Sequence, residues 1–307
     1  MKAVITGATG AVGMALVSAL INKNCEVLVL CRPGSARNER LGDIEGVRIA
    51  ECSLSDLKHY ESCESYDVFF HLGWAGTTGQ ARNDMYLQNK NVKYTLDAVN
   101  LAHRLGCSVF VGAGSQAEYG RVSGTLSSKT PTEPENGYGI AKLTAGRMSR
   151  ILCSELGIKH VWARILSVYG EYDGENSMVM STINKILNGS VPEFTPAEQV
   201  WDYMYSADAA EALIAVAERG RDGATYCLGG GDPKRLYEYI EMIRDAVNKK
   251  AELGIGRLPY SNNQVMYLSA DISELTNDTG FVPRYSFNEG IAKTVDWVRS
   301  RNLIMSR

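Results

Sequence analysis

Metal-binding and disulfide patterns are missing from this sequence. Its seven cysteines are scattered without a C-x-x-C pair, and its four histidines share no ligand spacing. Isolated cysteines of this kind are typical of free thiols in a reducing compartment, so we expect neither a disulfide framework nor a metal centre. Only 8 of the 307 residues are proline, and these form no proline-rich linker between separate domains.

An excess of charge of one sign is also missing. The 32 basic and 35 acidic residues give a formal net charge of −3, which offers no reason to expect a nucleic-acid groove. The one long uncharged stretch, Ala3–Ile21, contains three glycines and two threonines, so a membrane span or signal peptide explains it poorly. We therefore expect a soluble cytoplasmic protein without nucleic-acid or membrane partners.

Apolar, β-branched runs alternate with helix-length amphipathic segments through the first half of the chain. This alternation predicts an α/β fold with a Rossmann-type, doubly wound parallel sheet. The expected strands are Lys2–Thr6, Glu26–Cys31, Val47–Ala50, Asp67–Leu72, Ser108–Gly112 and His160–Ile165, and the expected helices are Ala11–Lys23, Asp84–Leu105 and Tyr138–Leu156.

The rhythm changes after Tyr169, where polar loops separate shorter elements. There we expect helices at Ser177–Leu187, Ser206–Arg219, Leu236–Asn248 and Asn288–Arg301, and strands at Ala224–Leu228 and Val265–Leu268. This pattern predicts an NADP-binding Rossmann domain over residues 1–169, with a returning segment near 199–228. Residues 170–307 would form mainly a smaller substrate-binding domain.

A glycine-rich turn joins the first strand to the first helix, reading Gly7-Ala8-Thr9-Gly10-Ala11-Val12-Gly13. Glycine permits a tight turn and close approach of the backbone to a pyrophosphate, and the helix N-terminus supplies free N–H groups and a positive dipole. The expected cofactor contacts in this turn are Gly7, Thr9, Gly10, Ala11, Val12 and Gly13.

The end of the second strand bears on the choice of nicotinamide cofactor. An acidic residue there would bind the adenosine ribose and favour NAD(H), but the sequence reads Cys31-Arg32-Pro33-Gly34-Ser35. Arg32 can pair with a 2′-phosphate, and Ser35 and Arg37 offer further donors. The sequence favours NADP(H), with NAD(H) remaining open.

A phenol and an ammonium lie four residues apart in Tyr138-Gly139-Ile140-Ala141-Lys142, on one face of an expected helix. A neighbouring ammonium stabilises phenolate and lowers the pKa of a tyrosine, which suits Tyr138 to acid–base work. Ser115 follows an apolar strand at the edge where open α/β sheets bind their ligands, so its hydroxyl is a candidate to hold a substrate oxygen.

These motifs together resemble the extended short-chain dehydrogenases/reductases of the NAD(P)-dependent epimerase/dehydratase family. The similar segments are Gly7–Gly13, His71-Leu72-Gly73, Asn91, Gly112–Gly120, Tyr138/Lys142, Arg164–Gly170 and Trp201–Asp208. The resemblance implies a nucleotide-sugar substrate and a homodimer formed through the helices near Asp84–Leu105 and Tyr138–Leu156.

The resemblance also implies roles for individual residues. Ser115, Tyr138 and Lys142 would be catalytic, and Tyr138 and Lys142 would also contact the cofactor. Further cofactor contacts would come from Ser53, Leu54, Leu72, Gly73 and Asn91, and substrate contacts from Trp74, Gln116, Trp201 and Arg164. Glu118 is a weaker candidate, because side chains alternate in extended backbone.

Departures from the family pattern narrow the expected activity. Gln116-Ala117 stands where 4,6-dehydratases carry Asp-Glu, and Cys31-Arg32 stands where typical 4-epimerases carry an acidic residue. The segments 114–120 and Trp74-Ala75-Gly76 resemble reductases of 4-keto-6-deoxy nucleotide sugars, the class that includes CDP-abequose synthase. We expect an NADPH-dependent reductase. The alternatives are a UDP-glucose 4-epimerase-like enzyme with tightly bound NAD(P), or a non-catalytic dinucleotide-binding regulator.

Overall fold

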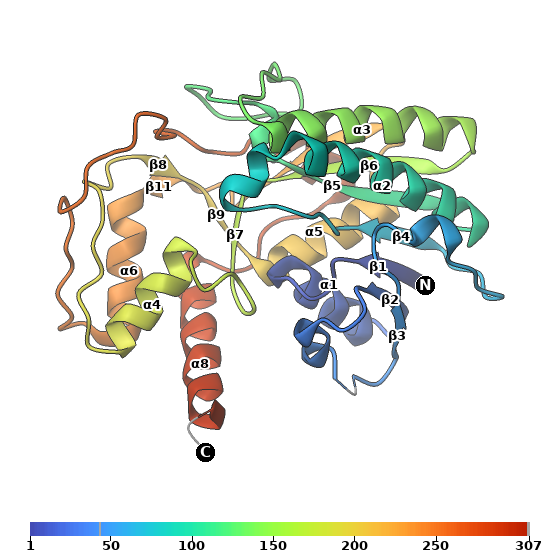
Figure 1. Ribbon diagram of the computed structural model, residues 1–307. Helices are drawn as coiled ribbons and strands as arrows, with labels where there is room; N and C mark the ends of the chain where they lie inside the picture. Colours follow the sequence, from blue (N-terminus) through green and yellow to red (C-terminus); the bar gives the residue numbers. More distant parts are fainter. Residues whose placement is uncertain (43, 306–307) are drawn as a thin grey trace.

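The computed structural model describes residues 1–42 and 44–305, and it has a central sheet covered by helices on both faces (Figure 1). All neighbouring strands of this sheet pair in parallel, in the order β10-β6-β5-β4-β1-β2-β3. Its strands are β1 (Lys2–Thr6), β2 (Glu26–Cys31), β3 (Val47–Glu51), β4 (Val68–His71), β5 (Val109–Ser115), β6 (Lys159–Ile165) and β10 (Ala224–Leu228). The prediction of a Rossmann-type fold is confirmed.

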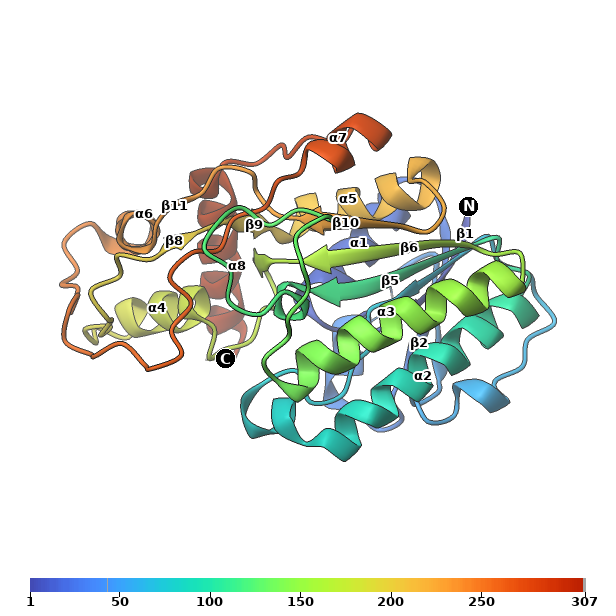
Figure 2. The same ribbon diagram turned by 90° about the horizontal axis from the view of Figure 1, so that it is seen from above.

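Two pairs of helices cover the two faces of the sheet (Figure 2). Helices α1 (Ala11–Asn22) and α5 (Ser206–Arg219) lie on one face, and α2 (Met85–Arg104) and α3 (Gly137–Glu155) lie on the other. Successive residues of β1 enter different cores, because Ala3 and Ile5 pack on the α1 side and Val4 on the α2 side. Burial on both faces explains why the strands read as continuous apolar runs.

The order of the strands reverses between β1 and β4. At such a switch point the connections leave in opposite directions, and the carboxyl ends of the two strands border a crevice for ligands. Strand β1 leads into the glycine-rich turn, and β4 leads into the loop that contains Gly73 and Trp74. The fold therefore brings together two of the segments that the sequence singled out.

The remaining elements form a smaller unit to one side of the sheet (Figures 1 and 2). They are α4 (Met178–Leu187), α6 (Leu236–Asn248), α8 (Phe287–Met305), β7 (Ser167–Tyr169), β8 (Val200–Trp201), β9 (Tyr203–Tyr205) and β11 (Lys234–Arg235). Helix α7 (Ser273–Thr279) instead packs against α5 and β10 (Figure 2). The core of the smaller unit is rich in aromatic rings, with Phe287 in contact with Tyr169, Tyr203 and Tyr239. After β9 the chain returns to the sheet through α5, and β10 lies beside β6 at the sheet edge. The boundary at residue 169 stays a prediction.

One expected strand is not formed. The segment Val265–Leu268 makes only an isolated bridge, between Tyr267 and Val200, because β8 is two residues long and offers little edge for pairing. Among the described helices, none has the length and apolar character that a membrane span needs.

Candidate active site

The three glycines of the turn after β1 have different surroundings. Gly7 has a φ of +76°, and a Cβ there would lie 2.6 Å from the backbone nitrogen of Gly73. A Cβ on Gly13 would lie 2.3 Å from the carbonyl oxygen of Gly7, so this glycine lets α1 pack against the turn. Gly10 precedes α1, and a Cβ there would approach only the Gly7 oxygen, at 3.9 Å. Open space therefore borders the helix N-terminus, where a pyrophosphate is favoured.

A cleft of about 660 Å³ runs along the carboxyl ends of β1, β2 and β4. Arg32, Ser35 and Arg37 lie at the β2 end of this cleft, and none of the described residues that line it is acidic. The Asn38 side chain donates to the carbonyl oxygen of Arg32 at 3.0 Å, which fixes the basic turn against the 3-10 turn η1 (Ala36–Arg40). The cleft therefore has hydrogen-bond donors and a basic end.

The predicted cofactor residues divide into two groups. Those that line this cleft are Gly7, Thr9, Arg32, Ser35, Ser53, Leu54 and Gly73. The others lie elsewhere around the site: Gly10, Ala11, Val12, Gly13, Leu72, Asn91, Tyr138 and Lys142. The sequence did not single out Cys52, Ser55, Ala75 and Tyr94, which also line the cleft.

The three predicted catalytic residues converge from two elements. Ser115 is the last residue of β5, and Tyr138 and Lys142 lie in the first turns of α3. All three side chains are largely buried. The Lys142 ammonium donates to the carbonyl oxygen of Ala113 on β5 at 2.6 Å, which ties α3 to the strand that ends in Ser115. Burial raises the pKa of the Tyr138 phenol, and the neighbouring Ser115 hydroxyl opposes that rise.

The aromatic ring of Trp74 covers Lys142. The ammonium nitrogen lies 3.8 Å from the centre of the indole ring, and the same ring meets Tyr138 edge-on at 6.0 Å. Burial lowers the pKa of Lys142 to about 7, and the Glu118 carboxylate acts in the opposite direction. Lys142 is therefore poised to gain or lose a proton near neutral pH.

The pKa of Tyr138 moves against the expected direction. Burial raises it, whereas the Ser115 hydroxyl and the Arg82 guanidinium lower it. Lys142, which we expected to lower it, lies 5.8 Å from the centre of the phenol ring, with its ammonium held by Trp74 and Ala113. Burial therefore outweighs the lowering that we expected from the neighbouring ammonium, and the role of Lys142 in activating the phenol stays a prediction.

The buried carboxylate of Glu118 binds the backbone of Ser115. Glu118 lies in the 3-10 turn η4 (Gln116–Glu118), and its Oε1 accepts hydrogen bonds from the Ser115 backbone N–H at 2.8 Å and from Trp162 Nε1 at 3.0 Å. Its Oε2 accepts from Arg164 Nε at 2.7 Å, in an ion pair that is almost fully buried. A Cβ on Gly114 would lie 2.4 Å from Trp162 Nε1, so glycine there makes room for the indole. Sequence reasoning had ranked Glu118 only as a weaker candidate for the site.

Two amides of α2 hold the loop after β4. Asn91 binds both backbone groups of Ala75, accepting from its N–H at 3.0 Å and donating to its carbonyl at 2.8 Å. Gln88 accepts from Trp74 Nε1 at 2.8 Å and donates to the carbonyl of Ala81 at 2.8 Å. The position of Trp74 over Lys142 is thus set by buried side chains of a neighbouring helix.

The predicted substrate residues do not form one cluster with these groups. Trp74 lies at the catalytic residues, and Gln116 opens η4 directly after Ser115. Trp201 instead packs among Tyr119, Leu126 and Leu268, and its Nε1 donates to the Ser167 hydroxyl at 2.8 Å. Arg164 has Glu118 as its partner, with its guanidinium 4.5 Å from the centre of the Tyr119 ring. The substrate roles of all four stay predictions.

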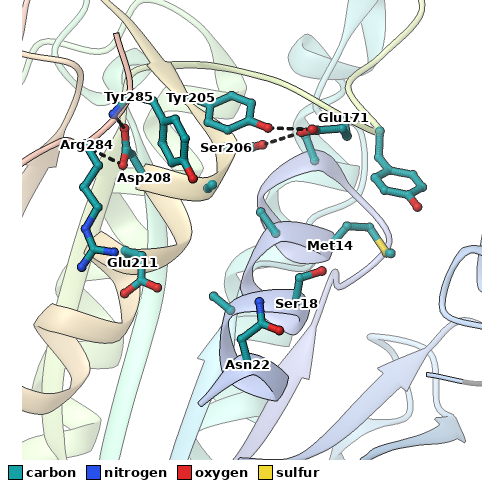
Figure 3. Close-up of a pocket in the computed structure, with 15 residues that line it drawn as sticks. Met14, Ser18, Asn22, Glu171, Tyr205, Ser206, Asp208, Glu211, Arg284 and Tyr285 are labelled. Carbon is teal, nitrogen blue, oxygen red and sulfur yellow. Dashed lines mark hydrogen bonds between the residues drawn. The ribbon is translucent and has the colours of Figure 1, made fainter. Parts of the chain in front are cut away.

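A second cavity, of about 380 Å³, lies between α1 and α5 (Figure 3). Its polar groups bind one another: Tyr205 donates to Glu171 at 2.6 Å, and Asp208 accepts from the backbone N–H of Arg284 at 3.0 Å and of Tyr285 at 3.1 Å. None of the catalytic candidates lines it. These contacts tie the segment before α8 to α5, and we assign the chemistry to the switch-point crevice.

Comparison with known proteins identifies the family of this chain. Residues 3–229 match the model of the NAD dependent epimerase/dehydratase family. The chain belongs to this family. It is accordingly an oxidoreductase-type enzyme of the extended short-chain dehydrogenase/reductase class, which decides against a non-catalytic regulator.

Two similar curated proteins have different printed activities. A dTDP-4-dehydro-6-deoxyglucose reductase from Escherichia coli is 27% identical over 201 residues, which cover 64% of this family member and 63% of that enzyme. A dTDP-glucose 4,6-dehydratase from Xanthomonas campestris pv. campestris is 26% identical over 201 residues, covering 61% and 57%. Each match thus spans less than two thirds of the relative's length.

Solved structures share the whole fold. A UDP-N-acetylglucosamine 4-epimerase from Methanobrevibacter ruminantium M1, in complex with UDP-N-acetylmuramic acid, has a TM-score of 0.87 at 24% identity over 98% of both chains. A dTDP-glucose 4,6-dehydratase from Streptomyces venezuelae, solved with NAD bound, has a TM-score of 0.85 at 20% identity over 99% and 98%. At these identities the likeness establishes the fold, and a pyridine nucleotide is the cofactor of this family.

Proposed function

We propose that this enzyme reduces the keto group of a nucleotide sugar with NADPH. The observation that carries the proposal is the convergence of Ser115, Tyr138 and Lys142 beside η4, where Gln116 and Ala117 provide no carboxylate. Loss of water from a sugar needs an acid and a base at the neighbouring carbons, and that pair is missing at these positions. Reduction needs one proton donor and one oxygen-binding group, which Tyr138 and Ser115 supply.

In this proposal the dinucleotide supplies the hydride. Tyr138 donates its phenolic proton to the developing alkoxide, and the Ser115 hydroxyl donates a hydrogen bond to the same oxygen. Lys142 then returns a proton to the Tyr138 phenolate and takes one from solvent, since burial brings its pKa to about 7. Trp74 lies over the ammonium and holds its position.

The preference for NADP(H) rests on the basic end of the 660 Å³ cleft. Arg32, Arg37 and Ser35 line it, and guanidinium groups suit the oxygens of a 2′-phosphate. We further propose that residues 170–307 hold most of the nucleotide sugar, because this unit stands beside the carboxyl ends of β5 and β6 (Figure 2). Cytoplasmic location and a homodimer remain proposals of the same kind.

A nucleotide-sugar 4-epimerase is the second candidate, favoured by the solved epimerase of the same fold. An epimerase keeps its cofactor between two opposite hydride transfers, whereas a reductase must exchange it in every turnover. The test is the dinucleotide content of protein purified without added cofactor, released by denaturation and measured at the nicotinamide absorbance. A reductase should be mostly empty. One dinucleotide per chain would support the epimerase.

A further inference from the structure

The Arg82 guanidinium lies over the catalytic phenol. Its central carbon is 4.3 Å from the centre of the Tyr138 ring. Arg82 belongs to the 3-10 turn η3 (Gly79–Asn83), which precedes α2 and is far in sequence from α3. The guanidinium also donates a hydrogen bond from Nη1 to the carbonyl oxygen of Thr77 at 3.1 Å. Both partners are uncharged, so neither offsets the charge that faces the phenol.

The backbone of η3 is anchored on both sides of Arg82. On one side, the carbonyl of Ala81 accepts from Gln88 at 2.8 Å. On the other, the Asn83 side chain accepts from the backbone N–H of Gly137 at 3.0 Å. A Cβ on Gly137 would lie 3.1 Å from the carbonyl oxygen of Arg82, so this glycine lets the turn pack closely against the start of α3. Arg82 is therefore held in place rather than free in solvent.

The charges around Tyr138 come from three elements. Arg82 faces it from η3 and favours the phenolate, and Glu118 faces it from η4 and opposes the phenolate. Lys142 lies on the same helix as Tyr138, but burial removes much of its charge near neutral pH. Guanidinium keeps its charge throughout this range. Arg82 is thus the dependable positive charge beside the phenol.

We propose that Arg82 is a positioning residue for Tyr138, whose fixed charge over the phenol ring stabilises the phenolate and so sets its readiness to exchange a proton. The inference rests on the proposed role of Tyr138 as proton donor. If the Arg82 guanidinium is removed, most of its stabilisation of the nearby phenolate is lost. A lysine at the same position would retain part of that stabilisation.

The test is a titration that needs neither substrate nor cofactor, so its result is separate from the identity of the reaction. Tyr138 is replaced by 3,5-difluorotyrosine, whose fluorines bring ionisation into a mild pH range, and ¹⁹F NMR follows that single phenol. Arg82→Met should move its ionisation upward by about one pH unit. Arg82→Lys should bring the ionisation most of the way back to that of wild type. Lys90→Met, on the exposed face of α2, should leave the titration unchanged.

Kinetics give the second readout. In the reduction reaction, Arg82→Met should lower kcat by up to about tenfold and leave KM nearly unchanged, because the residue acts through Tyr138. An unchanged ¹⁹F titration in Arg82→Met would overturn the proposal. The same outcome with a raised KM would assign Arg82 to an anionic group of the substrate instead. Equal shifts in Arg82→Met and Arg82→Lys would also overturn it, since charge would then not be the cause.

Discussion

The ammonium of Lys142 lies 3.8 Å from the centre of the Trp74 indole ring, under a side chain that sequence alone could only suggest as a substrate contact. The indole partly compensates for the lost hydration of the ammonium, because a cation is attracted to the face of an aromatic ring. Burial still dominates, since the pKa of Lys142 falls from 10.5 to about 7. The site therefore holds a lysine that is easily deprotonated.

This pKa predicts how stability depends on pH. Between pH 7 and 10.5 the unfolded chain keeps the lysine proton that the folded protein has released, so the unfolding free energy contributed by Lys142 rises with pH. The unfolding free energy of wild type minus that of Lys142→Met should rise by up to about 1.4 kcal/mol per pH unit in this window. Urea unfolding at pH 7, 8 and 9 measures it. The exposed control Lys90→Met should give a difference that is flat with pH, and a flat Lys142→Met series would refute the assigned pKa.

The buried pair of Glu118 and Arg164 makes a second prediction. Glu118→Gln leaves the guanidinium without its counter-charge, and Arg164→Met leaves the carboxylate without its own, so each should destabilise the fold by about 3–5 kcal/mol. The double variant should lose much less than the sum, because no charge is then left buried and unpaired. Denaturant unfolding of the four proteins gives the coupling. Additive losses would show that the two side chains are not energetically coupled.

Cofactor choice is tested at Arg32. Its replacement by alanine should weaken NADPH binding by about 1.5–3 kcal/mol, the scale of a charge-assisted contact, and leave NADH binding nearly unchanged. Fluorescence titration of the same variant with both cofactors supplies the control. Equal losses for NADPH and NADH would mean that Arg32 does not contact the 2′-phosphate.

The proton donor is tested by Tyr138→Phe, which keeps the ring that packs against Trp74 and Arg82. Turnover should fall by about 10² or more, a usual range for the loss of general acid–base catalysis. Cofactor affinity should change little, since the phenol oxygen is the only atom removed. A variant with near-normal turnover would place the acid elsewhere.

The sheet could be predicted from the sequence because its strands are apolar on both faces and its helices are long. The short elements could not: β7, β8 and β9 have two or three residues each, too few for a period to be read. Glu118 was ranked as a weaker candidate because side chains alternate in extended backbone, whereas residues 116–118 form a 3-10 turn that brings the carboxylate to the Ser115 backbone N–H.

Only the part of the candidate site that lies in local motifs could be predicted from the sequence. Local motifs pointed to the glycine turn, to Ser115 and to the Tyr138/Lys142 pair, because each depends on spacing within one element. Arg82 belongs to no motif, and its approach to Tyr138 depends on how η3 packs against α3. The cover of Lys142 by Trp74 likewise depends on Gln88, a helix residue without any distinguishing pattern.

The most direct test of the account offers the purified enzyme 4-keto-6-deoxy and 4-hydroxy nucleotide sugars with NADPH, and follows the nicotinamide absorbance together with the sugar products. The account predicts loss of one NADPH for each keto sugar converted to the alcohol. Interconversion of the gluco and galacto forms without net use of NADPH would contradict it and establish the epimerase.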